Sequence, residues 1–434
     1  MRKILIYCLT VLFLTSCGNS STQRKGGNEP SIDSATTVLT TSDIKPVVNV
    51  YIENSASMDG YVKGITEFEL AVYNYLSNIK TSEITDTLNL FYINSKPIPY
   101  ATNVDFDVIS DFIEKLEPNE FRNRGGNRGT TDISNLFKNI LSETGENDVA
   151  ILVTDGIFSP GTGRDAVEYL INQQIGITNT MTEHLKKHPK TAVMVYQLTS
   201  NFNGKYFNRE DRPETINASR PYYIWVIGDH TNIALLKAHI PDTKFKGGGV
   251  QHSYTLLPPY NKEIDYAILN SPKSGSFDRD KKSPKNSICK IKKASKGVHK
   301  GNFSFTTGMD LYTFSVLLGD EYLMNTDSYA RLINKQPNND YLIEIEHNTN
   351  PNTDYTHNMK LTTDKISVGE LEIVLRNQFP QWIYDINDDE GLDIHKNDAI
   401  NKTFGIKYLV EGIYEAYNPL ESSIYATMKF NLKK

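Results

Sequence analysis

The sequence predicts a mixed α/β fold: a doubly wound, mostly parallel sheet, followed by a β-rich C-terminal domain that ends in a helix. Two observations favour this class. Between about residues 46 and 242, apolar runs alternate with amphipathic helix patterns, which is typical of an open parallel sheet covered by helices on both faces. After about residue 243 the pattern changes to short alternating segments separated by turn residues.

The strands of the first part are predicted from short apolar runs. The run at residues 46–53 (PVVNVYIE) is apolar and ends in polar residues, as a buried parallel strand does. Further runs of this kind lie at residues 88–94, 148–153, 191–198 and 222–227.

The helices between these strands are predicted from apolar residues three and four positions apart. In residues 67–79 this spacing places Phe68, Val72, Leu76 and Ile79 on one helical face. The same pattern predicts helices at residues 107–116, 132–141, 166–188 and 232–240.

A second domain is predicted from residue 243 to 434. It begins at the run Gly247-Gly248-Gly249, and alternating segments such as residues 341–346 (YLIEIE) predict strands within it. Near the end, Thr403 is the expected N-cap of a helix. The apolar positions of that helix are Ile406, Leu409, Val410, Ile413 and Ala416.

The composition of the 434 residues excludes several classes of protein. Lys plus Arg is 46 and Asp plus Glu is 52, so the net charge is −6, and nucleic-acid binding as the main role is not expected. A mean hydropathy of −0.44 excludes a polytopic membrane protein. Three cysteines are too few for a disulfide scaffold.

The N-terminus has the pattern of an export signal. Arg2 and Lys3 precede a short apolar segment at residues 4–14, which is too short to span a bilayer comfortably. The LTSC sequence that follows, ending at Cys17, resembles the lipobox of bacterial lipoproteins. The resemblance implies a signal peptide at residues 1–16, cleavage before Cys17 and acylation of its thiol by palmitate or a related chain. The alternative is an ordinary signal peptide with a chance cysteine.

The segment after Cys17 predicts a tether and a location. Residues 17–44 are rich in Ser, Thr, Gly and Asn without an apolar period, so we expect a lipidated flexible tether. No acidic run follows Cys17, whereas some surface lipoproteins of Bacteroidota carry one as an export signal. We therefore expect a lipid-anchored protein of the cell envelope, on the outer membrane and facing the periplasm.

Three polar segments are expected at the ends of strands or at a helix start, where α/β sheets bind ligands. They are residues 53–58 (ENSASM), 129–133 (GTTDI) and 154–156 (TDG). Together they offer hydroxyl and carboxylate oxygens, which are the ligands that Mg²⁺ prefers. A site of this kind keeps open positions that a partner's carboxylate can fill.

These three segments resemble the metal-ion-dependent adhesion site of the von Willebrand factor A (vWA) domain. The resemblance covers about residues 46–242 and implies a vWA-like, Rossmann-like domain at residues 45–242. It implies that Mg²⁺ or Mn²⁺ is held by Ser55, Ser57, Thr131 and Asp155, with Thr130 as an alternative to Thr131. The first Asp of the family pattern is Glu53 in this chain, and we expect its longer carboxylate to take part in the site.

The resemblance implies a protein-binding module rather than an enzyme. The expected partner is an envelope or surface protein that offers an acidic side chain to the metal, with no nucleic acid involved and with the membrane reached through the lipid anchor. Two alternatives stay open. One is a metal-assisted hydrolase that uses Asp155 and Glu53. The other is a structural envelope protein with a degenerate metal site.

Two charged segments are weaker candidates. Residues 273–300 contain ten Lys or Arg against Asp278 and Asp280, a local balance of +8. This segment could contact an anionic surface such as phospholipid headgroups. We expect a solvated face instead, because aromatic residues do not alternate with the basic ones. Residues 385–391 resemble a calcium loop, but Lys396 stands where that loop needs a bidentate Glu, so we expect a solvated acidic turn.

Overall fold

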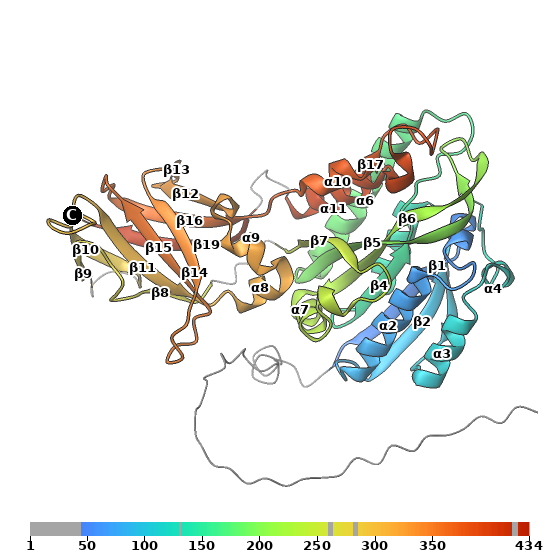
Figure 1. Ribbon diagram of the computed structural model, residues 1–434, viewed down its shortest axis with the longest axis horizontal. Coiled ribbons are helices and arrows are strands. Elements are labelled where there is room, and N and C mark those ends of the chain that lie inside the picture. Colours follow the sequence, from blue (N-terminus) through green and yellow to red (C-terminus); the bar gives the residue numbers. More distant parts are fainter. Residues whose placement is uncertain (1–44, 130–131, 259–263, 281–284, 419–423, 434) are drawn as a thin grey trace, which may run out of the picture. The chain divides into compact units, whose positions relative to one another are not determined.

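A computed structural model describes residues 45–129, 132–258, 264–280, 285–418 and 424–433. The predicted signal peptide, Cys17, the tether, Thr130 and Thr131 lie outside the described residues. The fold is mixed α/β, as the sequence predicts, with a seven-stranded sheet and further β-sheets (Figure 1). Within the described residues, no helix combines the length and the apolar character needed to cross a membrane.

The first sheet has the strand order β3-β2-β1-β4-β6-β5-β7. Strand β1 (Val47–Glu53) pairs in parallel with β2 (Thr87–Ile93) on one side and with β4 (Val149–Thr154) on the other. The remaining strands are antiparallel to their neighbours: β3 (Pro97–Ala101), β5 (Thr191–Phe207), β6 (Pro213–Asp229) and β7 (Val250–Leu256).

The prediction of a mostly parallel sheet is therefore wrong. Only the β1–β2 and β1–β4 pairs are parallel, and the other four neighbouring pairs are antiparallel. The main cause is that β5 and β6 form one long hairpin closed at residues 208–212. A connection this short can join only antiparallel strands, because a parallel pair needs a crossover of a dozen or more residues.

Helices cover both faces of this sheet, as the sequence predicts. Alternate residues of β1 separate the two faces: Val48 and Val50 belong to one apolar cluster and Tyr51 to the other. The first cluster includes apolar residues of α2 (Glu67–Thr81), α3 (Phe106–Glu114) and α7 (His230–His239). The second includes residues of α5 (Ile133–Glu143), α6 (Ala166–Lys187) and α11 (Ile406–Tyr417).

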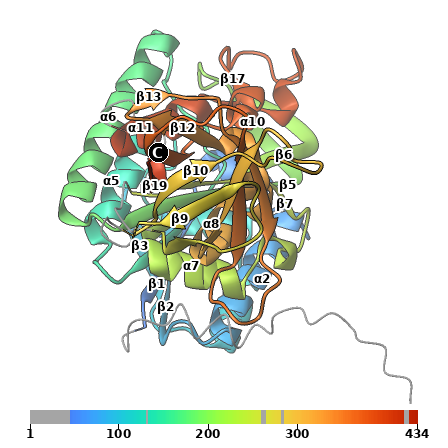
Figure 2. The same ribbon diagram turned by 90° about the vertical axis from the view of Figure 1, so that its left-hand side faces the viewer.

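Helix α11 belongs to the layers of the first sheet although it lies far along the chain. It runs beside α6 in Figures 1 and 2. The two helices approach closely at Gly412, where a Cβ would lie 2.8 Å from the carbonyl oxygen of Gln174. The hydroxyl of Thr178 donates to the Gly412 carbonyl at 3.0 Å. Both α11 and β7 thus lie beyond the predicted boundary between residues 242 and 243 and complete the first sheet and its cover.

The β-rich part contains two larger sheets and short helices. A six-stranded sheet has the order β13-β12-β16-β19-β10-β9, and a four-stranded sheet has the order β14-β15-β11-β8. Their strands are β8 (Tyr266–Ile268), β9 (Ser276–Arg279), β10 (Ser287–Lys292), β11 (Phe303–Met309), β12 (Tyr329–Ile333), β13 (Gln336–Pro337), β14 (Leu342–His347), β15 (His357–Thr363), β16 (Gly369–Arg376) and β19 (Ile424–Leu432).

Short elements join these layers. They are η1 (Ala56–Gly60), α4 (Pro118–Asn123), η2 (Asp242–Lys244), α8 (Tyr312–Leu318), α9 (Asp320–Met324), η3 (Thr326–Ser328), α10 (Gln381–Asp385), η4 (Ala399–Asn401) and the strand pair β17 (Asn387–Asp388) and β18 (Thr403–Phe404).

The predicted C-terminal helix exists, but two details of the prediction are wrong. Thr403 lies in β18, and the N-cap of α11 is Gly405, whose φ of 79° suits a residue without a side chain. The described chain does not end in that helix, because β19 follows it and pairs with β16 and β10. The predicted apolar face is confirmed: Ile406, Leu409, Val410, Ile413 and Ala416 are all buried.

Candidate functional site

The carboxyl edge of the first sheet brings together two of the three predicted polar segments. Strands β1 and β4 are parallel and pair Ile52 with Val153, so Glu53 and Thr154 end the two strands side by side. The hydroxyl of Thr154 donates a hydrogen bond to Oε2 of Glu53. Asp155 follows directly, and both carboxylates are only 1% exposed. These two segments thus meet at buried strand ends, which is where an α/β sheet places its ligands.

Ser55 and Ser57 stand as a pair at the exit of β1. Their hydroxyl oxygens lie 2.9 Å apart, and either one can donate to the other. Ser55 is buried, with extended backbone, at the N-cap of η1. The same 2.9 Å is about the edge of an octahedron whose ligands lie about 2.0–2.1 Å from a central Mg²⁺. The spacing of the two hydroxyls therefore suits two adjacent ligands of such an ion.

The buried carboxylate of Asp155 is only partly satisfied by hydrogen bonds. Its Oδ1 accepts a hydrogen bond from the Ile157 N–H at 3.1 Å. Its Oδ2 is buried and has no hydrogen-bond partner among the described residues. Burial raises the pKa of Asp155, and the Ser57 hydroxyl acts against this shift without meeting the geometry of a hydrogen bond. The Ile157 N–H and the Arg220 charge also lower the pKa.

These donors fit a small, hard cation. A buried carboxylate oxygen without a partner costs about 1–3 kcal/mol or more, and a bound cation removes that cost. Asp155 and the paired hydroxyls of Ser55 and Ser57 would hold the ion. Glu53 lies next to them with one carboxylate oxygen on the Thr154 hydroxyl, so the site offers at least one full carboxylate and two neutral oxygens.

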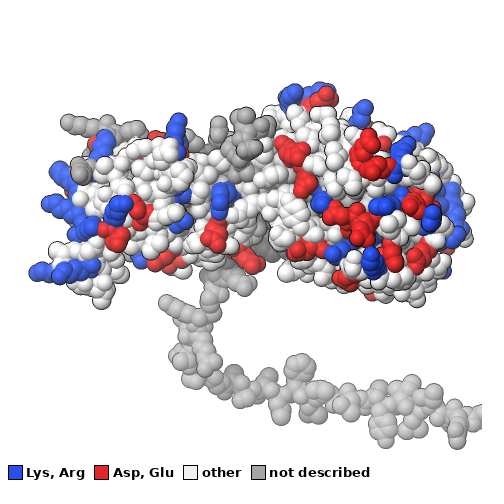
Figure 3. All heavy atoms as spheres, turned by 90° about the horizontal axis from the view of Figure 1, so that it is seen from above, with Lys and Arg blue, Asp and Glu red and all other residues white. Residues whose placement is uncertain are grey.

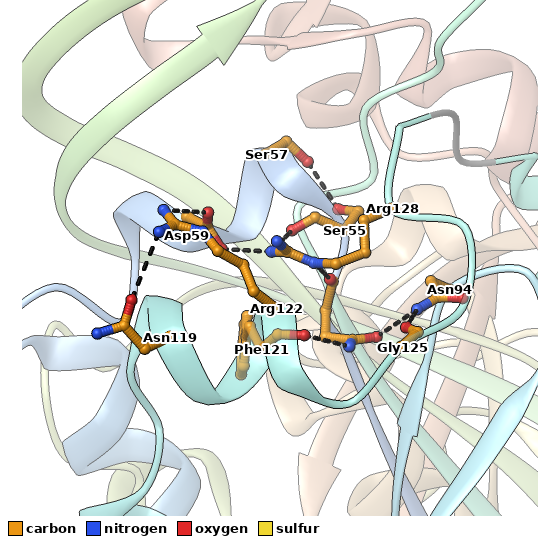
Figure 4. A network of polar contacts seen from close by, with 10 residues as sticks. Ser55, Ser57, Asp59, Asn94, Asn119, Phe121, Arg122, Gly125 and Arg128 are labelled. Atoms are coloured by element: carbon orange, nitrogen blue, oxygen red, sulfur yellow. Dashed lines mark hydrogen bonds and ion pairs between the residues drawn. The ribbon is translucent and has the colours of Figure 1, made fainter.

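An arginine that the sequence analysis missed holds the serine loop in place. Arg128 Nε donates to the Asn54 carbonyl at 2.7 Å, and its guanidinium also donates to the Ser55 carbonyl at 3.1 Å (Figure 4). The same guanidinium pairs with Asp59, to which Arg122 adds a second ion pair at 3.2 Å. One side chain therefore fixes the backbone on which both serines stand.

Two asparagines form a second support. Asn94 follows β2 as Asn54 follows β1, and its Nδ2 donates to the Asn54 Oδ1 at 2.9 Å and to the Gly125 carbonyl at 2.9 Å. Asn54 Nδ2 in turn donates to the Phe121 carbonyl at 3.1 Å. At Gly126 a Cβ would lie 2.1 Å from Asn94, so only glycine permits this approach. Asn94 could have been found from the sequence, because it is a polar residue at the end of a predicted strand.

The residues on either side of Thr130 and Thr131 are held by hydrogen bonds. Thr131 and the alternative Thr130 lie outside the described residues, so their role stays a prediction. On one side of them, the Arg128 carbonyl accepts from the Ala56 N–H at 3.0 Å. On the other side, Asp132 caps α5 by accepting from the Asn135 N–H at 3.0 Å. The loop is therefore tied to the serine segment at one end and to a helix start at the other.

The segment before α11 closes the interior side of the site. Arg220, on β6, is buried and donates to the carbonyls of Ala399 and Ile400 at 3.0 and 2.8 Å. The Tyr223 hydroxyl donates to Thr403 Oγ1 at 2.9 Å. At Gly156 a Cβ would lie 3.2 Å from Ile406. Asp155, between these contacts and the sheet edge, is 1% exposed.

A cavity of about 400 Å³ lies next to the third segment. Asp132, Arg164 and Tyr169 contribute to its lining, and the Arg164 guanidinium lies 5.9 Å from the centre of the Tyr169 ring. No ion pair of Arg164 is found among the described residues. The cavity thus combines a cation with an aromatic surface beside Asp132.

The two charged segments behave as solvated surface in the described residues. Within residues 273–300, Lys290 pairs with Asp278 at 2.9 Å and Lys285 with Asp265 at 3.0 Å. Basic side chains project from the β-rich end that carries β9 and β10 (Figure 3). In the acidic turn, Asp389 pairs with Lys407 at 2.6 Å. Such pairs partly neutralise individual charges on these exposed surfaces.

Comparisons of the chain with known protein families, with curated proteins and with solved structures found no match. The functional argument therefore rests on the residues and their geometry.

Proposed function

We propose that the protein is a membrane-anchored envelope lipoprotein that binds a protein partner through a vWA-like site containing Mg²⁺ or Mn²⁺. The observation that carries the proposal is Asp155, whose buried Oδ2 lacks a hydrogen-bond partner among the described residues. It stands at the same sheet edge as the paired hydroxyls of Ser55 and Ser57. A hard cation between these groups satisfies the carboxylate and leaves ligand positions open.

The open positions define what the site can do. A bound Mg²⁺ attracts an anionic oxygen, so a partner's Asp or Glu side chain is the natural ligand. The cavity with Arg164 and Tyr169 is also lined by Asp132 and offers a second contact to the same partner. The network of Arg128 and Asp59 keeps the serine loop rigid, which reduces the entropy lost on binding.

One observation favours the alternative of a degenerate, structural site. Arg220 is buried and its positive charge lowers the pKa of Asp155, so it compensates part of the carboxylate charge without a metal. The alternative of a metal-assisted hydrolase has less support, because metal-assisted hydrolysis usually needs a general acid or base besides the metal ligands. Assays for turnover of phosphoester and ester substrates test that alternative directly.

Metal binding is tested by thermal unfolding of the wild-type chain and of Asp155→Ala, with and without millimolar Mg²⁺ or Mn²⁺. Because the ion binds the native state, a concentration of a hundred times Kd raises the free energy of unfolding by about 2.7 kcal/mol. We expect a higher Tm for the wild type and no response for Asp155→Ala. The matched control is Asp364→Ala, which removes an exposed carboxylate in the β-rich part and should respond like the wild type.

Three outcomes separate the proposals. A wild-type chain that shows no heat of Mg²⁺ or Mn²⁺ binding in calorimetry supports the degenerate site. A Tm response that survives in Asp155→Ala places the cation elsewhere. If the ion binds as expected, a partner captured from envelope extract should be lost with chelator and with Ser57→Ala, and retained with Asp364→Ala.

A further inference from the structure

A second group of metal-ligating side chains lies in the β-rich part, away from the sheet edge described above. His347 ends β14 and His357 begins β15, and the two residues are directly paired across these antiparallel strands. Their ring centroids lie 4.9 Å apart. Asp320, the first residue of α9, completes the group. One ligand atom from each of the three residues lies within 4.8 Å of the others.

The distances suit a tetrahedral transition metal. His347 Nε2 lies 3.4 Å from Asp320 Oδ2, and His357 Nε2 lies 3.9 Å from Asp320 Oδ1. Ligands about 2.0–2.1 Å from Zn²⁺ in a tetrahedron are separated by about 3.4 Å. The two distances end on different oxygens of the same carboxylate, and a small rotation of the Asp320 side chain, which is 44% exposed, brings a single oxygen toward this spacing from both imidazoles.

His357 is the observation that points to a ligand. Its side chain is 2% exposed, and its Nε2 has no hydrogen-bond partner among the described residues. An imidazole nitrogen buried in this way is costly unless something binds it. Nε2 is also the atom that faces the Asp320 carboxylate, so the unsatisfied nitrogen points into the group of three.

The neighbouring contacts hold His357 in the form that binds a metal. Its Nδ1 lies 2.8 Å from Thr356 Oγ1, which also accepts from the Leu311 N–H at 2.9 Å and donates to the Met309 carbonyl at 3.4 Å. The hydroxyl's remaining lone pair accepts the Nδ1 proton, which leaves the Nε2 lone pair for a cation.

Asp320 is oriented in the same way. The hydroxyl of Ser315 donates to its Oδ1, so the carboxylate is held toward the two histidines. Hydrogen bonds to the outer side of metal ligands fix their orientation in proteins, and here two hydroxyls, of Ser315 and Thr356, are placed to do this.

We propose that Asp320, His347 and His357 bind Zn²⁺, or another divalent transition metal that prefers imidazole, with the fourth position taken by water or by a ligand from a partner. Two imidazoles and one carboxylate select such a metal over Mg²⁺, whose preferred ligands are all oxygens. The proposal does not depend on the vWA-like site, because it uses different residues and a different class of metal.

The test is calorimetric titration of the full, chelator-treated chain, without a histidine tag, with Zn²⁺ and with Co²⁺. The wild type should bind one ion, and the Co²⁺ form should show the visible absorption of tetrahedral coordination. Asp320→Asn and His347→Ala should each weaken binding by at least tenfold. Both residues are well exposed, so these variants should fold, and His299→Ala, at an exposed site in the same part, should bind like the wild type.

The outcomes are distinguishable from those for the sheet edge. Zn²⁺ binding that persists in Asp155→Ala and is not displaced by millimolar Mg²⁺ supports the second site. Binding that is lost in Asp155→Ala but unchanged in His347→Ala and Asp320→Asn would assign the Zn²⁺ to the vWA-like site and overturn this proposal. A wild-type chain that binds neither Zn²⁺ nor Co²⁺ would overturn it as well.

Discussion

Glu53 is the residue at which this chain departs from the vWA pattern, and its contacts make its role testable. One of its oxygens is held by the Thr154 hydroxyl at the end of the neighbouring strand. We predict that Glu53→Gln weakens Mn²⁺ affinity by roughly tenfold, about 1.4 kcal/mol, because the charge is lost while an oxygen stays available to Thr154. Glu53→Asp should retain most of the affinity. Titration of the three proteins at one pH measures this.

A contrary result is easy to recognise. If the Gln variant binds Mn²⁺ as tightly as the wild type, the Glu53 carboxylate is not a ligand, and the ion is held by Asp155 and the hydroxyls of Ser55 and Ser57.

At this scale the sequence predicts which candidate ligand residues meet better than it predicts the residues that hold them. Ser55, Ser57 and Asp155 follow strand patterns, and strand ends of a parallel pair meet at one edge, so their proximity can be predicted. Arg128 and Asp59 could not be found in the same way. Arg128 acts on the backbone carbonyls of residues more than seventy positions away, and any residue type can supply a carbonyl.

Among the elements, the helices were predicted more accurately than the strand directions. The apolar spacing that identifies α2, α5 and α6 is a local property, and each of these helices lies within a few residues of its predicted range. Strand direction depends on the connection. Residues 199–221 contain no apolar period, and the structure uses them to extend β5 and β6 into one hairpin, which reverses the predicted direction of pairing.

The end of the chain shows the same limit. Residues 424–432 alternate between buried and more accessible positions along most of β19, which is a strand pattern that the sequence analysis passed over after the stronger helix signal. Thr403 looked like an N-cap because of its residue type, but its hydroxyl accepts a hydrogen bond from Tyr223 instead. Tertiary contacts therefore override a local capping preference at this position.

The junction of α6 with β5 predicts a pH dependence of stability. His184, in the last turn of α6, is buried, and its Nε2 lies 3.1 Å from Thr191 Oγ1 at the start of β5. Burial and the neighbouring His188 lower the pKa of His184 to about 4, against about 6.5 in the unfolded chain. Between these values the unfolded chain binds more protons, so stability falls as the pH falls.

We expect His184 to remove about 2–3 kcal/mol of stability between pH 7.5 and pH 4.5. Urea unfolding of the wild type at the two pH values measures the loss. His184→Gln should show a smaller loss, and His299→Gln, at an exposed histidine, should behave like the wild type. Parallel pH profiles for the wild type and His184→Gln would contradict the assignment.

For the whole molecule, the first question is attachment to the membrane. The predicted lipobox ends at Cys17, and acylation at this residue would supply more than one chain, enough for stable anchoring. We predict that Cys17→Ala releases the protein from membranes and abolishes incorporation of radiolabelled fatty acid. Cys289→Ala is the matched control, since it removes a cysteine in the β-rich part. Unchanged labelling of Cys17→Ala would contradict the prediction.

The position of α11 against α6 has a consequence for how the protein is made. A ribosome delivers residues 47–256 first and the β-rich segment next, and only then the helix that buries the apolar flank of α6. Throughout this interval the face of the first sheet that α5 and α6 cover lacks its third helix. An emerging chain in that state exposes apolar surface that invites aggregation. Completion of this layer therefore requires translation through α11, and prematurely terminated products should become substrates for chaperones and proteases.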